Sequence, residues 1–281
     1  MSEIQLSAGT LRYQDVGSGP PVVLVHGLLV NGSVWERLVP LLSQRVRCIV
    51  PDLPLGSHPR AMDREADLSP LGLARLIAEL LERLDLDEAT LVGNDTGGAL
   101  CQLTAVHHPQ RIGRLVLVNC DSFEHFPPPA FRFVVRALGH TPGVVAGLEL
   151  LGRLRAMRRA TMSIAPLTLT PVPDELLKGW LAPLRDRGVR ADLVKVLRGI
   201  DPALTVAAGE RLGEFHRPAL IAWGTRDRFF PLSDAERLAQ ALPDSKLERI
   251  DNARTFVQLD APERLAELIG AFVATPATNS A

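Results

Sequence analysis

The segment Gly93-Asn-Asp95-Thr-Gly97 constrains the fold of this chain more than any other, because it has the form Gly-x-Asp-x-Gly at a strand-to-helix junction. Residues 89–93 have the pattern of a buried strand, and residues 99–107 have the pattern of a helix. A strand that turns sharply into a helix needs glycine beside the turn, because Cβ atoms there would collide. Such a turn projects its central side chain, Asp95, toward the positive N-terminal end of the helix.

Short apolar runs alternate with helical patterns on both sides of this turn, which predicts a mostly parallel sheet with helices on both faces. The expected strands are residues 4–7, 11–16, 21–25, 46–50, 89–93, 115–119, 218–223 and 246–250. The expected core helices are residues 33–44, 69–84, 99–107, 233–241 and 262–273. Leu, Arg, Ala and Val recur at helical spacing from residue 122 onward, which indicates a helical insertion. We therefore expect a core at residues 1–121, a helical cap at 122–208 and the rest of the core at 209–281.

Taken alone, Asp95 also fits an ordinary helix N-cap, for which aspartate is a favoured residue. Two further segments favour the strained turn instead. His26-Gly27 follows the apolar run 21–25, and Asp227 closes a Gly-x-x-Asp segment after the run 218–223. With these three segments in this chain order, the sequence resembles the α/β-hydrolase superfamily from His26 to the closing helix. The resemblance implies the α/β-hydrolase fold, with a mostly parallel eight-stranded sheet and a helical cap.

The resemblance also implies roles for individual residues. The backbone N–H groups of Leu28 and Thr96 would form an oxyanion hole, and Asp227 would be the acid of a catalytic triad. Asp95 stands where most members have serine, and in this it is similar to haloalkane dehalogenases and epoxide hydrolases. In those relatives the aspartate attacks an alkyl carbon, and a histidine-activated water hydrolyses the resulting ester.

The chemistry of a carboxylate nucleophile makes the histidine necessary only in the second half of that cycle. A carboxylate is ionised at neutral pH, with a reference pKa of about 4. Its attack on carbon therefore needs no general base, unlike that of serine. Hydrolysis of the ester does need one.

The histidine expected after the last strand is replaced in this chain. The segment after residue 250 fits the pattern of the superfamily, and Thr255 stands at the histidine position. Threonine is not a base at neutral pH, and no histidine follows His216. Without its usual partner, Asp227 is expected to form an ion pair with Arg226, Arg228 or Arg254.

Three other residues are candidates for contact with a substrate. Asn119 matches a halide-binding position of some dehalogenases, His125 lies at the core–cap junction, and Arg254 is a candidate for binding a substrate carboxylate. The tryptophan that dehalogenases place after the nucleophile is replaced by Thr96. The cap tyrosines of epoxide hydrolases have no counterpart, since the only tyrosine is Tyr13 in the opening strands.

Charge and composition argue against several other classes of function. The net charge of -1 gives no electrostatic case for nucleic acid or an anionic membrane as partner. The chain has no apolar run of about 18 residues and no signal-peptide pattern, so we expect a cytoplasmic protein. The spacing of its cysteines, Cys48, Cys101 and Cys120, is not that of a metal site. We therefore expect buried thiols and no metal or organic cofactor.

Two classes of function follow from these features. The first is an enzyme that acts on a small, largely apolar substrate through Asp95, as a hydrolase of the dehalogenase or epoxide hydrolase type. A desolvated Asp95 with a raised pKa would instead serve as general base of a lyase or isomerase, for which no histidine is needed. The second class is a non-catalytic protein that binds a small ligand in the same pocket, which the missing histidine, tryptophan and tyrosines favour.

Overall fold

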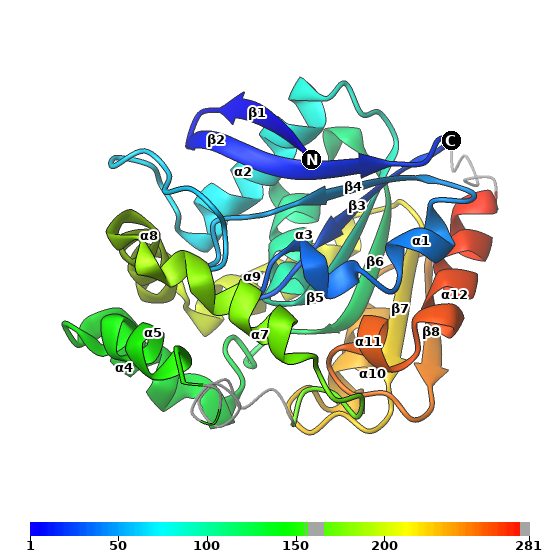
Figure 1. The fold of residues 1–281 in the computed structure, drawn as a ribbon. Coiled ribbons are helices and arrows are strands. Elements are labelled where there is room, and N and C mark those ends of the chain that lie inside the picture. Colours follow the sequence, from blue (N-terminus) through cyan, green and yellow to red (C-terminus); the bar gives the residue numbers. More distant parts are fainter. Residues whose placement is uncertain (155, 157–165, 276–281) are drawn as a thin grey trace.

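The computed structural model describes residues 1–154, 156 and 166–275. Its centre is an eight-stranded sheet in the order β1-β2-β4-β3-β5-β6-β7-β8 (Figure 1). Strand β2 pairs antiparallel with β1 and β4, and the other pairs are parallel, which confirms the expected mostly parallel sheet. The strands are β1 (Ser2–Leu6), β2 (Gly9–Val16), β3 (Pro21–Val25), β4 (Arg47–Pro51), β5 (Ala89–Asp95), β6 (Ile112–Cys120), β7 (Ala219–Gly224) and β8 (Ser245–Ile250).

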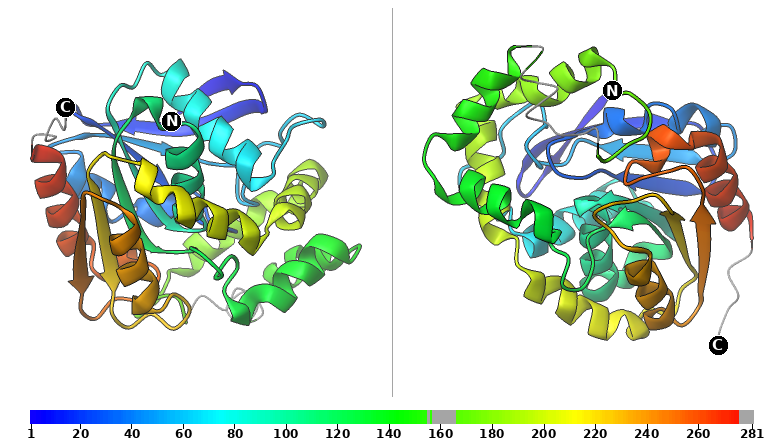
Figure 2. Two further views of the ribbon diagram at one scale, coloured as in Figure 1. Left: turned by 180° about the vertical axis from the view of Figure 1, so that it is seen from behind. Right: turned by 90° about the horizontal axis from the view of Figure 1, so that it is seen from below.

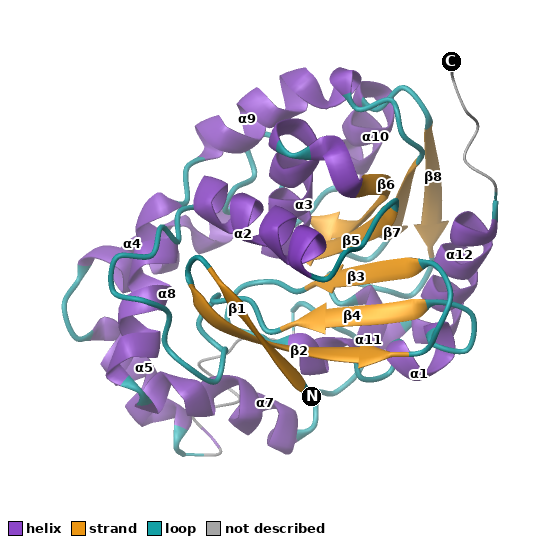
Figure 3. Ribbon diagram, turned by 90° about the horizontal axis from the view of Figure 1, so that it is seen from above, coloured by secondary structure: helices purple, strands orange, loops and turns teal. Residues whose placement is uncertain are grey.

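Helices cover both faces of this sheet, as the alternating pattern predicts (Figure 3). Apolar residues of α2, α3 and α10 share one buried cluster with the sheet, and those of α1 and α12 share the other. Helix α3 is buried on every side, because α2 and α9 pack against its outer face. The helices of the core are α1 (Val39–Leu42), α2 (Pro70–Arg83), α3 (Thr96–His107), α9 (Pro202–Arg211), α10 (Leu232–Ala241), α11 (Val257–Asp260) and α12 (Pro262–Ala274). Short 3₁₀ turns lie at Gly32–Trp35, Pro109–Arg111, Pro129–Phe131, Ala182–Arg185 and Leu212–Glu214.

Where the structure describes it, the expected cap consists of helices joined by loops, with an isolated β-bridge between Ser122 and His125. Its helices are α4 (Arg132–His140), α5 (Val144–Gly152), α7 (Asp174–Leu181) and α8 (Arg187–Gly199). They stand beyond the end of the sheet toward which the arrows of β3 and β4 point, and α4 and α5 are set off from the sheet in both views of Figure 2. Residues 155 and 157–165 of the expected cap lie outside the described residues. The expected boundary at residue 208 falls inside α9, which packs against the core helix α3.

The expected single helix at residues 33–44 is wrong. The segment forms a 3₁₀ turn at Gly32–Trp35 and a separate short helix, α1, which starts beside Pro40. Proline has no N–H to donate and is tolerated only in the first turn of a helix, so the helical pattern restarts there. Trp35 and Leu42 are nevertheless buried, as the apolar spacing predicts. In the described part of the chain, none of the helices has the length and apolar character to cross a membrane.

The junction between β5 and α3 depends on close contacts between backbones. A Cβ on Gly97 would lie 2.3 Å from the carbonyl oxygen of Val25 on β3. A Cβ on Gly98 would lie 2.2 Å from the Cβ of Cys120 on β6. The start of α3 therefore approaches both neighbouring strands to a distance that only glycine allows.

Gly98→Ala is expected to lower the free energy of unfolding by about 1–3 kcal/mol or more, because its methyl group must displace β6 or α3. Gly179→Ala is the matched control, since a Cβ on Gly179 of α7 meets no atom within 4 Å. This control is expected to raise the stability by up to about 1 kcal/mol through helix propensity. Denaturant unfolding followed by circular dichroism measures both values. Equal stabilities for the two variants would contradict the close approach.

Candidate active site

Asp95 occupies the junction of β5 and α3 in a backbone conformation that few non-glycine residues adopt. Its φ is 55°, in the left-handed region, and its side chain makes no capping hydrogen bond to α3. A Cβ on Gly27 would lie 2.1 Å from Oδ2 of Asp95, so the carboxylate packs directly on the backbone at Gly27. The side chain is partly exposed, and it faces a cavity. Backbone strain of this kind is found at sites where the fold must hold one side chain in a functional position.

Burial and neighbouring groups act in opposite directions on the ionisation of Asp95. The pKa of Asp95 is raised to about 7, chiefly by burial and to a smaller extent by the charge of Asp227. Hydrogen bonds from the backbone N–H groups of Leu28 and Thr96 lower it. Both N–H groups that the sequence assigns to an oxyanion hole thus donate to the Asp95 carboxylate itself. They are placed to hold negative charge on an oxygen of this carboxyl group.

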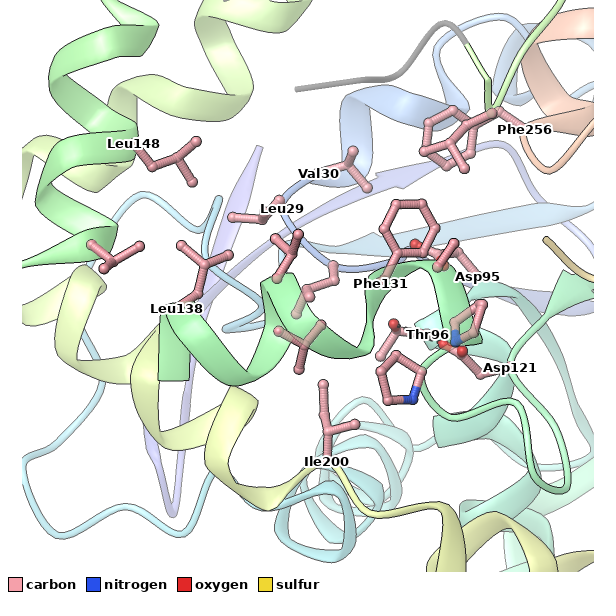
Figure 4. A pocket seen from close by; sticks show the side chains of 18 of the residues that line it. Leu29, Val30, Asp95, Thr96, Asp121, Phe131, Leu138, Leu148, Ile200 and Phe256 are labelled. Atoms are coloured by element: carbon pink, nitrogen blue, oxygen red, sulfur yellow. Dashed lines mark hydrogen bonds between the residues drawn. The ribbon is translucent and has the colours of Figure 1, made fainter. Parts of the chain in front are cut away.

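Asp95 lies at one end of a cavity of about 690 Å³ between the core and the cap (Figure 4). The lining is mostly apolar and comes from the loop after β3, from α4 and α5, and from single residues of other elements. It includes Leu29, Val30, Phe131, Leu138, Leu148 and Phe256. Among the described lining residues, the polar side chains are those of Asp95, Thr96 and Asp121. The cavity therefore suits a small apolar ligand whose reactive group meets these three side chains.

Asp121 is a carboxylate of the cavity that the sequence reasoning missed. It follows β6 directly and is 1% exposed, and its Oδ2 accepts a hydrogen bond from Oγ1 of Thr96 at 3.0 Å. Its Oδ1 is buried and has no hydrogen-bond partner among the described residues. Burial, followed by the charge of Asp95, raises the pKa of Asp121 well above its usual range. The available signal was its position, since neighbouring parallel strands bring their carboxyl ends to one edge of the sheet.

Both acids therefore bind a proton more tightly than an exposed carboxyl group does. Burial is the first cause in each case, and it raises the pKa of Asp95 to about 7 and that of Asp121 well above its usual range. Acids with raised pKa values in a cavity are characteristic of sites that transfer protons.

Thr255, at the expected histidine position, lies beside Asp227. Its Oγ1 donates a hydrogen bond to Oδ2 of Asp227 at 2.9 Å, and Nδ2 of Asn119 donates to the same oxygen at 2.8 Å. The backbone N–H groups of Phe229 and Phe230 donate to Oδ1 at 2.8 and 3.1 Å. Four neutral donors thus satisfy this carboxylate, although burial still raises its pKa.

The expected ion pair of Asp227 with Arg226, Arg228 or Arg254 is wrong. Within the described chain, the hydrogen bonds of Asp227 come from the neutral groups named above. The Arg254 guanidinium instead contacts the carbonyl oxygen of Thr168 at 3.4 Å. The Asp227 carboxylate is therefore held by neutral hydrogen-bond donors and has no ion-pair partner among the described residues.

The three candidates for substrate contact are not brought to the cavity. The Asn119 amide is engaged on both sides, because its Oδ1 accepts from the N–H of Gly224 at 2.6 Å while its Nδ2 donates to Asp227. His125 pairs through Nδ1 with Oδ2 of Asp234 at 2.5 Å. Neither these two residues nor Arg254 is among the lining residues. Their partners elsewhere in the protein account for their positions.

None of the seven histidines, all of which lie in the described part of the chain, lines the cavity. His26 is buried, its Nδ1 contacts the carbonyl oxygen of Gly27 at 2.8 Å, and its Nε2 accepts from the N–H of Leu53 at 2.9 Å. Burial lowers the pKa of His26, so this ring is neutral and supports the loop that carries Leu28. Over the described residues, no group of three or more His, Cys, Asp or Glu side chains is arranged to hold a metal ion.

Comparison with known proteins identifies hydrolases with the same architecture. A sequence model described as the alpha/beta hydrolase family matches residues 22–268. The chain is 29% identical over 270 residues to haloalkane dehalogenase 2 of Mycobacterium tuberculosis, covering 94% of this chain and 91% of that protein. It is 26% identical over 283 residues to 2-hydroxy-6-oxo-6-phenylhexa-2,4-dienoate hydrolase of Comamonas testosteroni, covering 95% and 92%. The solved structure of a meta-cleavage product hydrolase from Pseudomonas fluorescens superposes with a TM-score of 0.77 at 24% identity, covering 97% of each chain.

Asp95→Asn is expected to stabilise the protein at neutral and alkaline pH, by an amount that shrinks as the pH falls. The native pKa of about 7 lies above the unfolded value of about 4, so the native state binds more protons between these pH values. The stability of the unsubstituted protein therefore falls as pH rises through this window, whereas asparagine resembles the protonated acid at every pH. Denaturant unfolding of both proteins across this window measures the difference. A difference that does not vary with pH would contradict the raised pKa.

Proposed function

The chain belongs to the alpha/beta hydrolase family, and from that premise we propose that it is an enzyme in which Asp95 attacks a small, largely apolar electrophile. The observation that carries this proposal is the partly exposed Asp95 carboxylate at the end of an apolar cavity, with two backbone N–H groups directed at it. A carboxylate so placed has lost most of the water that would weaken it as a nucleophile. Its attack on carbon requires no base.

The proposed first step forms an ester on Asp95. One carboxylate oxygen bonds to the substrate carbon while the bond from that carbon to the leaving group breaks. Addition of water to the ester carbonyl would then place negative charge on an Asp95 oxygen. The N–H groups of Leu28 and Thr96, which already donate to this carboxyl group, would stabilise that charge.

Similarity to the haloalkane dehalogenase supports an alkyl carbon as the target, and similarity to the dienoate hydrolase supports hydrolysis of a small organic molecule. The lining of the cavity supports an apolar substrate, since cationic side chains are missing from its described part. A charged carboxylate substrate would meet Asp95 and Asp121 without a counterion among the described lining residues.

A second candidate function is general-base catalysis by Asp95 in a lyase or isomerase. The observation that favours it is the pKa of Asp95, raised by burial to about 7, because a catalytic base is most effective when its pKa is near the working pH. Asp95 would then remove a proton from carbon and form no covalent intermediate.

Incubation with 1-bromohexane is expected to attach one hexyl group to Asp95 and release one bromide per chain. The reaction is expected to stop there, because no histidine lines the cavity to activate water. The alkylation rate should rise with pH to a plateau with a midpoint near 7, since only the ionised acid attacks. Intact-mass spectrometry, peptide mapping and bromide release measure these outcomes. Asp95→Asn is the control and should gain no mass.

Failure of this test has a defined meaning. If no electrophile adds mass at Asp95 at any pH at which the protein stays folded, the nucleophilic role is wrong. Proton exchange at carbon without an adduct would then favour the general-base function. Ligand binding that is indifferent to Asp95→Asn, without turnover, would favour a binding protein.

Thr255→His is expected to convert the single turnover with 1-bromohexane into repeated bromide release. The imidazole would stand beside Asp227, whose Oδ2 now accepts from Thr255, and would activate water for attack on the ester. Thr255→Ser keeps the hydroxyl and is the matched control, with one bromide per chain. If the hexyl ester persists in a folded Thr255→His protein, Thr255 does not occupy the position of the base.

A further inference from the structure

We propose that Asp121 is the proton donor and then the water-activating base of this site, and that the substrates are small apolar epoxides. The inference rests on the proposed nucleophilic role of Asp95. It assigns to Asp121 the two proton transfers that would otherwise need cap tyrosines and a histidine.

The geometry around Asp121 supports this role. Asp121 is one of the three polar lining side chains, and in Figure 4 it lies with Asp95 and Thr96 at the same end of the cavity. Its Oδ2 accepts the Thr96 hydroxyl at 3.0 Å, and the backbone N–H of the same Thr96 donates to Asp95. One residue thus contacts both acids and holds them near each other.

The other oxygen of Asp121 is unused. Oδ1 is buried and has no hydrogen-bond partner among the described residues, although buried polar atoms are nearly always paired. Burial and the charge of Asp95 favour the protonated form of this acid. In that form it carries an O–H group for which the described residues supply no acceptor at Oδ1. An acceptor oxygen of a ligand bound at Asp121 would supply the missing partner.

Asp227 does not fit the same role. Each of its two oxygens already accepts two hydrogen bonds. Oδ2 accepts from Thr255 and Asn119, and Oδ1 accepts from two backbone N–H groups. It is also absent from the lining residues. Of the two acids near Asp95, Asp121 is therefore the one that lines the cavity and has an oxygen without a hydrogen-bond partner among the described residues.

The need for a proton distinguishes epoxides from alkyl halides. A departing halide carries its electron pair away as a stable anion and takes no proton. The oxygen of an opened epoxide stays bound to the product as an alkoxide, which is a strong base and must be protonated. A site with a neutral acid beside its nucleophile, and without cationic lining side chains in its described part, suits the second reaction.

The first step balances with the groups present. An Asp95 oxygen bonds to an epoxide carbon, the ring C–O bond breaks, and its electron pair takes the proton of Asp121. The products are a hydroxyalkyl ester of Asp95 and an ionised Asp121. Having a raised pKa, the ionised Asp121 is a strong base for its type.

The second step restores both acids. Asp121 takes a proton from water while the hydroxide adds to the ester carbonyl, and the Leu28 and Thr96 N–H groups hold the resulting oxyanion. This tetrahedral intermediate then collapses and expels the alkoxide of the product, which leaves Asp95 as a carboxylic acid. The alkoxide takes the proton of that acid, which is the second proton of the water. One epoxide and one water become one diol. With an alkyl halide, Asp121 never loses its proton in the first step, so the ester persists.

The test compares 1,2-epoxyhexane with 1-bromohexane, which share a carbon chain. The unsubstituted protein is expected to form hexane-1,2-diol over many turnovers. In Asp121→Asn, epoxide consumption should fall by about 10²–10⁴-fold, the usual contribution of general acid–base catalysis, and the hydroxyhexyl ester should accumulate on Asp95. The ratio of epoxide to bromide alkylation rates should fall at least about tenfold. Asn keeps the shape and neutral charge of the protonated acid.

Asp234→Asn is the matched control. Asp234 is also a buried acid with a raised pKa, but it pairs with His125 and does not line the cavity. It is expected to keep the ratio of the two rates. Thermal unfolding of each variant checks that the fold is intact.

Each outcome decides between the two proposals. Equal losses with both electrophiles, or diol formation at an unchanged rate in Asp121→Asn, would overturn the role of Asp121 while bromide alkylation still supports Asp95. Alkylation of Asp95 by neither electrophile would overturn the nucleophilic role and the inference with it.

A second measurement needs no variant. The ratio of epoxide to bromide alkylation rates of the unsubstituted protein should fall at high pH, where Asp121 loses its proton. A constant ratio would overturn the inference.

Discussion

The contact of the start of α3 with strands β3 and β6 is the constraint on which the site depends. Gly97 and Gly98 have no room for a Cβ against these strands, so α3 begins immediately where β5 ends. This leaves Asp95 in a left-handed conformation and aims the Thr96 N–H at its carboxylate. A buried amide extends the constraint to the loop after β8. Asn94 donates to the carbonyl oxygens of Val118 and Thr255 at 2.9 and 2.7 Å, which ties that loop to the elbow.

The fold could be predicted from the sequence because its signals are local. Apolar runs, helical spacing and glycines around one turn specify the sheet, its helical layers and the position of Asp95. The positions of the Leu28 and Thr96 N–H groups beside Asp95 could also be predicted, because backbone donors depend on the path of the chain and not on side-chain conformation. Their role as an oxyanion hole stays a prediction. The helix expected at 33–44 was wrong because Pro40 restarts the pattern.

The side chains around Asp95 could not be assigned in the same way, because their directions depend on sheet register. The pairing of β5 with β6 shifts between Asn94 and Asp95, so that Asp95 lies opposite Cys120. Asn119 has a φ of 22° and directs its amide to Asp227 and Gly224, whereas Asp121, two residues later, reaches the cavity. A sequence pattern indicates where a strand ends, but it does not indicate such a shift. The pairing of Thr255 with Asp227 likewise joins loops 28 residues apart.

Three aspartates near one another have three different surroundings. Neutral donors satisfy Asp227, burial raises the pKa of Asp121 well above its usual range, and the pKa of Asp95 is raised to about 7. These raised pKa values lessen the mutual repulsion of the carboxyl groups, with no cation among the described lining residues. Environment, and not residue type, sets the role that each carboxyl group can take.

The apolar lining of the cavity has a consequence for ligand binding itself. An uncharged ligand that fills the cavity displaces the water that still reaches Asp95, and the ionised carboxylate loses more from this than the neutral acid does. Binding and protonation are then thermodynamically linked, so each bound ligand draws a fraction of a proton from the buffer. The observed heat of binding depends on the ionisation enthalpy of that buffer, and the affinity of an inert apolar ligand declines as pH rises through 7. The cavity thus couples ligand occupancy to proton uptake, whatever chemistry follows.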